Sequence, residues 1–436
     1  MTNKKYFFIG IGGIGMSSIA QYLYEKGNTI LGYDASENRS VKILVKKGVE
    51  VINKLSLERI PDYMKEEDVI VVYTPAIPDD NIFLKYFRSN GNNPIFKRSE
   101  ILGEISKQSK CIAVAGTHGK TTTTAIISHL FHSSGIHFKA FIGGIMKCFD
   151  SNYINTGNDY IIVEADEYDR SFLNLNANYA VITSIENDHL DIYGDFKSLT
   201  ESFQSFANNV KDVLITDAEI NLNKDFSFSI KNDSDYYVNN IDILENEIRF
   251  DLKTPNNFYS NISANILGLH NLKNVLAALS IIDQIKKIDI ENLLPFLSNF
   301  KGIERRMDIY KLDNKVVIDD YAHHPTEIES VLNTIQTNYK NKSKAVVFQP
   351  HLFSRTRDFM DEFATVLSKF DEVYLLDIYP AREKPIIGVS SQILLEKINC
   401  SKKELIDIKS IDNIVLNSKI EVISILGAGN ISDNLN

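Results

Sequence analysis

The sequence predicts an α/β protein built from three domains. Short runs rich in valine, isoleucine, tyrosine and phenylalanine alternate with amphipathic stretches along most of the chain, which is typical of parallel strands joined by crossover helices. The length of 436 residues suits three domains, since one domain takes about 150 residues. Apolar residues make up 44% and charged residues 24% of the chain, a balance that argues against a disordered or fibrous protein.

Net charge and cysteine content exclude several classes of partner and site. The formal net charge is −10, so we expect neither nucleic acid nor membrane as a partner, because both select basic surfaces. No segment approaches the roughly 18 apolar residues of a membrane-spanning helix. The cysteines, Cys111, Cys148 and Cys400, are odd in number and far apart, which argues against a disulfide framework or a zinc site and predicts a cytoplasmic protein.

Residues 1–108 are predicted to form the first doubly wound domain. Apolar runs rich in β-branched and aromatic residues predict its strands, and an amphipathic stretch predicts a helix between the first two of them. The strands are expected at residues 6–9, 29–33 and 69–73, and the helix at residues 15–26.

A glycine-rich turn joins the first strand to this helix. It contains Gly10, Gly12, Gly13 and Gly15, a spacing that brings a helix N-terminus close to a pyrophosphate. Asp34 ends the second strand, where a carboxylate can accept hydrogen bonds from ribose hydroxyls. We therefore expect a nucleotide site here. The alternatives are a tight turn without a ligand and the dinucleotide site of a nicotinamide-dependent oxidoreductase.

Residues 109–302 are predicted to form a second domain with a mostly parallel sheet. Strands are expected at residues 111–115, 160–164 and 180–185, with antiparallel pairing over residues 234–252. Helices at residues 271–285 and 290–300 are expected to close the domain. The linker to the third domain is predicted at Lys301-Gly302.

The strongest motif directly follows the first strand of this second domain. It comprises Gly116, Thr117, His118, Gly119, Lys120, Thr121 and Thr122 and precedes a helical run at residues 125–133. Glycines let backbone N–H groups face phosphates, a lysine adds positive charge, and a threonine hydroxyl can hold magnesium. Val114 stands where the common pattern has its first glycine. We therefore predict a variant phosphate loop, with a turn that binds nothing as the alternative.

Acidic residues follow two further strands of the second domain. Glu164, Asp166 and Glu167 end one strand, and Asp188 and His189 follow the next. Because ligands of open α/β sheets bind at the carboxyl ends of the strands, we expect these groups near the phosphate loop. Carboxylate oxygens suit Mg²⁺. For His189 alone, an ordinary hydrogen-bonded histidine is the alternative.

Residues 303–436 are predicted to form a third, again doubly wound domain. Strands are expected at residues 316–319, 345–348, 373–377 and 422–426, and helices near residues 326 and 357. Polar residues before and after the predicted linker are candidates for ligand contacts, but structural explanations also exist. After His270, either Asn271 or Asn274 suits the N-cap of the predicted helix. Arg306 suits a solvated pair with Arg305, and Asp320 suits a capped turn.

Jointly, these motifs resemble those of the Mur ligase family over the whole chain. The markers are residues 10–17, 116–122, 164–167, 188–191, 270–271, 305–306 and 319–325. The resemblance implies an N-terminal Rossmann-like domain for a UDP-sugar, a central ATPase of the P-loop type, and a C-terminal Rossmann-like domain that closes over ATP and the amino acid.

The resemblance also implies roles for single residues. Lys120, Glu164 and His189 would be catalytic, with Thr121 and Glu164 on one Mg²⁺ ion and His189 on a second. His270 and Asn271 would flank the adenine of ATP, Arg306 a phosphate and Asp320 the ribose. The glycine turn and Asp34 would hold the UDP-sugar.

Within the family, the chain resembles the branch that joins L-alanine to UDP-N-acetylmuramate in bacterial peptidoglycan synthesis. ATP would phosphorylate the sugar's carboxylate, and the amine of L-alanine would attack the acyl phosphate. Relatives that add later amino acids have a carbamylated lysine where this chain has Phe203. An asparagine that some relatives have in the central domain is absent from residues 141–144.

Three other functions stay open at this point. A recycling ligase of the same family attaches a whole tripeptide to the same UDP-sugar and shares nearly every motif. A nicotinamide-dependent oxidoreductase accounts for the glycine turn but leaves Lys120 and Thr121 without a role. A nucleotide-binding regulator without catalysis is disfavoured, because it does not require the acidic residues grouped at one sheet edge.

Overall fold

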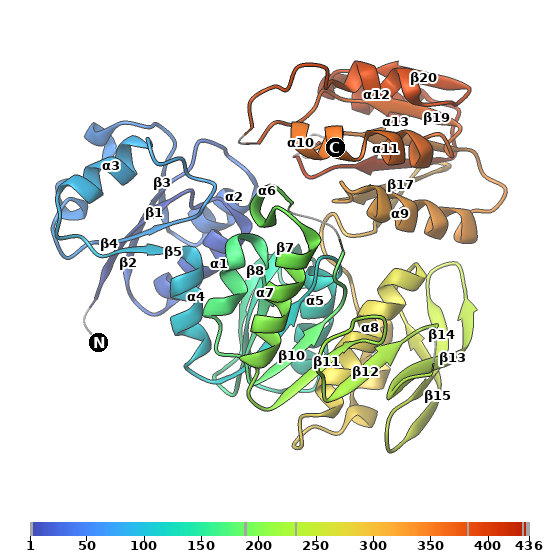
Figure 1. Ribbon diagram of the computed structural model, residues 1–436, viewed down its shortest axis with the longest axis horizontal. Helices are drawn as coiled ribbons and strands as arrows, with labels where there is room; N and C mark the ends of the chain where they lie inside the picture. The colour runs from blue at the N-terminus through green and yellow to red at the C-terminus, as the bar shows by residue number, and fades with distance from the viewer. Residues whose placement is uncertain (1–2, 187–189, 232, 382, 430, 433–436) are drawn as a thin grey trace. The chain divides into compact units, whose positions relative to one another are not determined.

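The computed structural model describes residues 3–186, 190–231, 233–381, 383–429 and 431–432. Three sheets flanked by helices make up the fold (Figure 1), which confirms the predicted α/β class with three domains. By packing, the chain divides into two compact units. The first comprises Met1–Ile241, Arg249–Asn265 and Lys273–Lys301, and the second comprises Asp242–Ile248, Ile266–Leu272 and Gly302–Asn436.

The N-terminal sheet has the doubly wound order β3-β2-β1-β4-β5, and its strands pair in parallel. This order places the first crossover, from β1 through a helix to β2, at the switch point where such sheets bind nucleotides. The strands are β1 Lys5–Ile9, β2 Thr29–Tyr33, β3 Glu50–Ile52, β4 Ile70–Tyr73 and β5 Ile95–Lys97, and the helices are α1 Ile14–Glu25, α2 Arg39–Lys46, η1 Leu57–Arg59, η2 Asp62–Met64, α3 Ile82–Ser89 and α4 Arg98–Ser106.

The central sheet has ten strands in the order β15-β14-β13-β12-β11-β10-β6-β9-β7-β8. Its strands are β6 Lys110–Ala115, β7 Phe138–Met146, β8 Ser151–Asn155, β9 Tyr160–Ala165, β10 Tyr179–Ile182, β11 Val213–Asp217, β12 Phe226–Ser229, β13 Tyr236–Ile243, β14 Ile248–Lys253 and β15 Phe258–Ala264. The helices are α5 Lys120–Ser133, η3 Tyr168–Asn174, α6 Leu190–Tyr193, α7 Phe196–Asn208, α8 Leu269–Asp283, η4 Ile290–Asn292 and η5 Leu294–Asn299. β6 lies between β10 and β9, so the segment after β6 is flanked by two parallel neighbours.

Three predicted boundaries in this region were wrong. The helix expected at residues 290–300 is two short 3₁₀ segments. Pro295 would lie in the interior of a single helix over this range, where its missing N–H and its ring disrupt the α-helical hydrogen bonds. The strand expected to reach residue 185 ends at Ile182. Helix α5 begins at Lys120 and therefore includes all four consecutive threonines, which shows that burial outweighs their weak helix propensity.

The third sheet has the order β16-β17-β21-β18-β19-β20, with only the β16 pairing antiparallel. Its strands are β16 Asp308–Leu312, β17 Lys315–Asp320, β18 Lys344–Phe348, β19 Glu372–Leu375, β20 Lys402–Leu405 and β21 Val422–Leu426, and its helices are α9 Pro325–Asn338, α10 Phe353–Asp358, α11 Met360–Leu367, α12 Ser391–Lys397, η6 Ile408–Ser410 and α13 Ile411–Asn417. The helix expected near residue 357 is a pair, since α10 ends at Asp358 and α11 begins at Met360.

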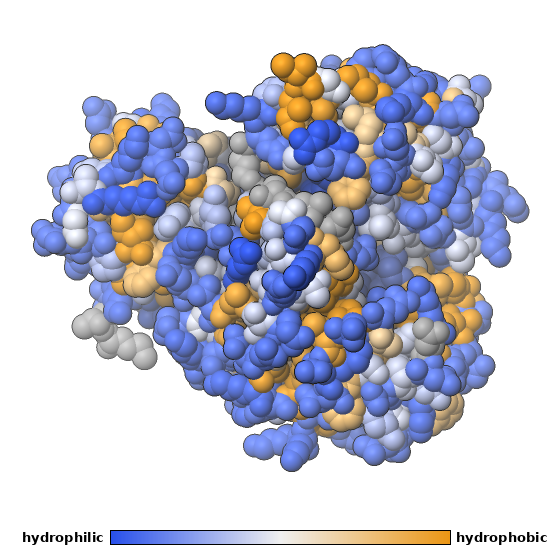
Figure 2. Space-filling model, in the orientation of Figure 1, coloured by the Kyte–Doolittle hydropathy of each residue, from blue (hydrophilic) through white to orange (hydrophobic). Residues whose placement is uncertain are grey.

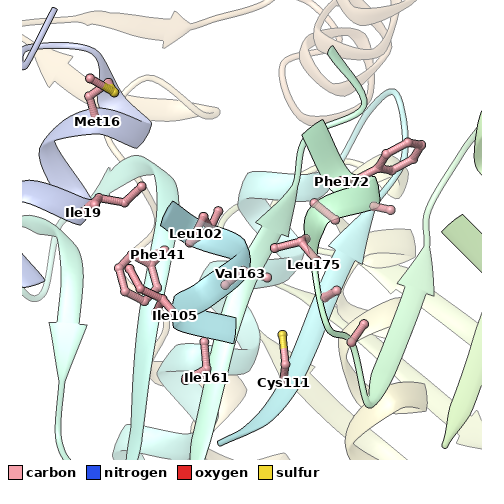
Figure 3. Close-up of a cluster of buried hydrophobic side chains, with 14 of the residues drawn as sticks. Met16, Ile19, Leu102, Ile105, Cys111, Phe141, Ile161, Val163, Phe172 and Leu175 are labelled. Atoms are coloured by element: carbon pink, nitrogen blue, oxygen red, sulfur yellow. The ribbon is translucent and has the colours of Figure 1, made fainter. Parts of the chain in front are cut away.

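The N-terminal and central sheets share one hydrophobic core. Met16 and Ile19 of α1 and Leu102 of α4 belong to the same buried cluster as Phe141 and Val163 of the central sheet (Figure 3). Burying large side chains of this kind contributes about 1.5–3 kcal/mol each. The glycine turn at the start of α1 is therefore held at a fixed distance from the central sheet.

Hydrophilic residues cover most of the face shown in Figure 2, with smaller hydrophobic groups between them. None of the helices in the described part of the chain combines the length and the apolar character that crossing a membrane requires.

Candidate active site

The segment between β6 and α5 forms a loop that only glycine permits at two positions. Gly116 has a φ of +131° and Gly119 a φ of +83°. A Cβ atom at Gly116 would lie 2.2 Å from Thr183 Oγ1, and one at Gly119 would lie 2.3 Å from Asn274 Oδ1. Both glycines are therefore required by backbone conformation and by close packing, as expected for a loop whose backbone approaches phosphates.

The loop is hydrogen-bonded to the segment that follows β10. The Ser184 hydroxyl lies 3.0 Å from Thr117 Oγ1 and accepts a hydrogen bond from the His118 N–H at 3.0 Å. Thr117 Oγ1 also accepts from the Glu186 N–H at 3.1 Å. These contacts explain why β10 ends at Ile182. The sequence analysis did not predict a role for Ser184. Two small polar residues, Thr183 and Ser184, follow an apolar strand, and this pattern could have indicated a contact with the loop.

The ammonium group of Lys120, the first residue of α5, is bound by other groups of the protein. It lies 2.8 and 3.0 Å from the two carboxylate oxygens of Glu167 and donates to the carbonyl of Gly116. Burial lowers the pKa of Lys120, but Glu167, Asp166 and other nearby carboxylates outweigh that effect, and the pKa is raised. Lys120 is therefore a fixed positive charge. Glu167 is fully buried. It was predicted to lie near the phosphate loop, but not as the partner of Lys120.

The first turn of α5 offers further groups to an anion. The side chains of Thr121 and Thr122 are both buried. The first N–H groups of a helix have no intrahelical acceptor, and the helix dipole adds positive potential at that end. The predicted phosphate-loop residues therefore come together at one helix N-terminus.

Glu164 lies near the end of β9, the strand beside β6. It is opposite Val114 in the parallel register, so its carboxylate is at the sheet edge from which the phosphate loop starts. Glu164 Oε1 accepts a hydrogen bond from the Gly143 N–H at 2.6 Å. A Cβ at Gly143 would lie 2.4 Å from Glu164 Oε2, so glycine in β7 leaves the space that this carboxylate occupies.

The oxygen donors at this edge suit a magnesium ion. The Thr121 hydroxyl and the Glu164 carboxylate are hard oxygen donors of the kind that Mg²⁺ prefers, and they are the residues that could hold the ion. Within the described residues, no group of three or more histidine, cysteine, aspartate or glutamate side chains is arranged to hold a metal. Asp188 and His189, which were predicted to contribute, lie outside the described residues.

The glycine turn and Asp34 meet at the end of β1. Gly10 has a φ of +83°. The Gly12 N–H donates to Asp34 Oδ2 at 2.8 Å, while Asp34 Oδ1 accepts from the N–H and hydroxyl of Ser36. Asp34 therefore stabilises the turn itself, whereas the ribose contact stays a prediction from the sequence.

Two predicted nucleotide residues lie together in the second unit. Asp320 ends β17, and its carboxylate accepts hydrogen bonds from the N–H groups of Met307 at 2.6 Å and Ala322 at 2.8 Å. Burial raises the pKa of Asp320 to about 6, although Arg306 opposes the shift. The Arg306 guanidinium lies 5.0 Å from the centre of the Tyr321 ring. A cation, an aromatic ring and a carboxyl group thus share the end of one strand.

His270 and Asn271 also belong to the second unit. Both lie in the first turn of α8, which begins at Leu269, so the N-cap interpretation was wrong. The Asn271 amide donates to the Leu267 carbonyl at 2.9 Å. Burial lowers the pKa of His270 to about 4, which makes the imidazole neutral at physiological pH. A neutral aromatic ring is suited to contact a base.

Comparison with known proteins identifies the family of the chain. Sequence models of three parts of one family match in succession: Mur ligase family, catalytic domain, over residues 5–110, Mur ligase middle domain over residues 114–282, and Mur ligase, glutamate ligase domain, over residues 305–423. These three matches together span most of the chain.

Individual relatives match over nearly their whole length. UDP-N-acetylmuramate–L-alanine ligase of Christiangramia forsetii is 44% identical over 99% of this chain and 96% of its own, and that of Flavobacterium psychrophilum is 41% identical over 98% and 95%. The solved structure of UDP-N-acetylmuramate-alanine ligase from Thermotoga maritima has a TM-score of 0.85 and 29% identity, covering 98% of this chain and 96% of that one. On this similarity of sequence and fold, the chain belongs to the Mur ligase family.

Proposed function

We propose that this protein is an ATP-dependent ligase that joins L-alanine to the lactyl carboxylate of UDP-N-acetylmuramate, in the synthesis of peptidoglycan precursors. The observation that carries the proposal is the full-length similarity, up to 44% identity, to relatives that bear the name of that ligase. The variant phosphate loop, with Lys120 fixed at its end, supports ATP as the energy source.

The chemistry requires activation of an unreactive carboxylate. One carboxylate oxygen attacks the γ-phosphorus of ATP, the bond to the β–γ bridging oxygen breaks, and ADP leaves. The amino group of L-alanine then attacks the acyl carbon, an amide forms, and inorganic phosphate departs after loss of a proton. Bound Mg²⁺ would neutralise charge on the transferring phosphoryl group. Lys120 and the N–H groups of the first turn of α5 stabilise the same charge.

In this proposal, residues of the phosphate loop and of other segments of the chain bind the nucleotide and its magnesium ion. The phosphate loop from Gly116 to Thr122 holds the phosphates, while Thr121, Glu164 and His189 bind magnesium. His270 and Asn271 contact adenine, Arg306 contacts a phosphate, and Asp320 contacts the ribose. A half-buried His270 with a lowered pKa, and therefore a neutral ring, supports the adenine assignment. The cation of Arg306, which lies over the Tyr321 ring, supports the phosphate assignment.

The UDP-sugar is assigned to the N-terminal domain, at Gly10, Gly12, Gly13, Gly15 and Asp34. The close approach of the Gly12 backbone to Asp34 supports this site, because a compact turn leaves room for a pyrophosphate beside the start of α1. We place the domains at residues 1–108 for the UDP-sugar, 109–302 for ATP, and 303–436 for closure over ATP and the amino acid.

A recycling ligase that adds a whole peptide is the main competing function. A solved murein peptide ligase from Psychrobacter arcticus has a TM-score of 0.74 but only 22% identity, so it shares the fold alone. The higher identity to alanine ligases favours the single amino acid.

A substrate panel tests the proposal. Phosphate release is measured with ATP, magnesium and UDP-N-acetylmuramate, and L-alanine, L-serine, glycine or a tripeptide is added in turn. We expect the highest kcat/KM with L-alanine. A higher value with the tripeptide would assign the chain to recycling, and no release with any of them would contradict a ligase function.

A further inference from the structure

An arginine from the N-terminal domain reaches into the acidic loop that holds Lys120. Arg98 is the first residue of α4. Its Nη2 lies 2.7 Å from Asp166 Oδ2, and its side chain is only 16% exposed. A Cβ on Gly15 would lie 2.6 Å from Arg98 Nη1. The guanidinium is therefore packed between the glycine turn of α1 and the loop that follows β9.

The acidic loop has a backbone that needs external support. Asp169 and Arg170 are consecutive non-glycine residues with φ of +53° and +54°. The left-handed conformation costs about 1–2 kcal/mol for each such residue, and it persists only where surrounding contacts determine it. Glu167, the partner of Lys120, lies two residues before Asp169, the first of these strained residues.

Contacts from two directions hold the loop. On one side Lys97 pairs with Asp169 at 2.8 Å, next to the Arg98–Asp166 pair. On the other side the Tyr193 ring lies under the Arg170 guanidinium at 4.9 Å, and the Tyr193 hydroxyl donates to the backbone carbonyl of Glu167. The Arg98 pair engages Asp166, the residue adjacent to Glu167. The Arg98 side chain is 16% exposed and that of Lys97 is 42% exposed, while the two aspartates are about equally exposed.

We propose that Arg98 is a positioning residue of the reaction, which acts through Asp166 to fix the Glu167–Lys120 pair and connects it to the glycine turn. This inference rests on the proposed ligase function. Without Arg98, the Asp166 carboxylate loses its counter-charge and competes with Glu167 for the Lys120 ammonium, so the ammonium leaves the position that serves the γ-phosphate. The effect falls on the chemical step and on ATP binding, both of which depend on Lys120. Binding of UDP-N-acetylmuramate is spared, because Arg98 is not assigned a contact with that substrate.

Steady-state kinetics of four variants and a double variant test this role. Arg98→Ala and Asp166→Asn each remove the pair, and Arg98→Lys keeps the charge without the planar fork. Lys97→Ala is the matched control, since it removes a more exposed pair on the same loop, where ion pairs contribute little. We expect Arg98→Ala to lower kcat by about 10- to 100-fold, with KM for UDP-N-acetylmuramate within about twofold of the wild type.

The double variant Arg98→Ala/Asp166→Asn is expected to be no worse than Arg98→Ala, because residues that act as a pair are not additive. Arg98→Lys should recover part of kcat, and Lys97→Ala should resemble the wild type. Unchanged kcat in Arg98→Ala, additive losses in the double variant, or a raised KM with normal kcat would overturn the proposal. The last outcome would make Arg98 a direct substrate contact.

A second readout separates this inference from the proposed function. Calorimetric titration with a non-hydrolysable ATP analogue needs no turnover. If the wild type releases no phosphate with UDP-N-acetylmuramate and L-alanine, the ligase assignment fails. The affinity for the ATP analogue then tests the positioning role of Arg98 by itself. We expect this affinity to fall in Arg98→Ala but not in Lys97→Ala. Equal affinities in the two variants would contradict the positioning role.

Discussion

The Lys120 ammonium lies 2.8 Å from a carboxylate oxygen of Glu167, and the Glu167 side chain has no solvent exposure. The phosphate-binding lysine is thus fixed by a buried partner instead of extending freely from its loop. An ammonium held in this way needs little reorganisation when negative charge develops on the transferring phosphoryl group, which is the condition for effective electrostatic catalysis.

Replacing Lys120 by alanine is expected to affect activity and stability together. Loss of one preorganised charge should lower kcat by on the order of 100-fold or more. The variant also leaves the buried Glu167 carboxylate without its cation, which should lower the free energy of unfolding by roughly 3–5 kcal/mol. Phosphate release and chemical denaturation measure the two effects.

Adding Glu167→Gln to Lys120→Ala separates the effect on activity from the effect on stability, because the glutamine amide carries no charge that needs a buried cation. The double variant should regain most of the lost stability and none of the lost activity. Near-normal kcat in Lys120→Ala would show that the phosphate-loop assignment is wrong.

Two glycines at opposite ends of α5 make a matched pair for a second prediction. Gly119 and Gly135 have φ of +83° and +73°, but a Cβ at Gly119 would meet Asn274 Oδ1 at 2.3 Å, whereas one at Gly135 would meet nothing within 4 Å. Both alanine variants should lose about 1–2 kcal/mol of stability from the backbone strain. Only Gly119→Ala should lose affinity for an ATP analogue in calorimetric titration, and equal affinities would contradict the account.

Sequence reasoning succeeded where neighbouring residues determine the outcome. The strands β2 and β21 and the phosphate loop have local patterns, namely runs of β-branched residues and glycines with positive φ. It also placed the acidic residues after β9 near the phosphate loop, from the shared sheet edge, but it failed to predict which side chains pair there. Glu167 lies 47 positions from Lys120, and Arg98 lies 68 positions from Asp166. No periodicity or spacing encodes such contacts, because register between distant strands and helices decides them.

The titration of Asp320 provides a third prediction. Its pKa in the folded protein is about 6, raised from 3.8 by burial, so the folded state binds the proton more tightly than the unfolded chain. Protonation of Asp320 therefore contributes fully to the free energy of unfolding below about pH 4. This contribution, at most about 3 kcal/mol, is lost as the pH rises to about 6. Carbon-13 NMR of the Asp320 carboxyl should show a midpoint near 6, and a midpoint near 4 would refute the burial argument.

Metal dependence is the fourth prediction. If Thr121 and Glu164 hold magnesium through oxygen atoms, activity should require Mg²⁺, and Mn²⁺ should replace it because it accepts the same donors. Glu164→Gln should raise the magnesium concentration needed for half-maximal activity, since it removes the charged ligand. Full phosphate release in excess chelator would exclude a metal role for these residues.

The most direct test of the proposed reaction follows the carboxylate oxygen. UDP-N-acetylmuramate labelled with ¹⁸O in both lactyl carboxylate oxygens is incubated with the enzyme, ATP, magnesium and L-alanine, and the released phosphate is analysed by mass spectrometry. Because the attacking oxygen bridges carbon and phosphorus in the acyl phosphate and departs with the phosphate, each phosphate should carry one ¹⁸O atom. Unlabelled phosphate, released while the L-alanine amide forms, would contradict an acyl-phosphate route.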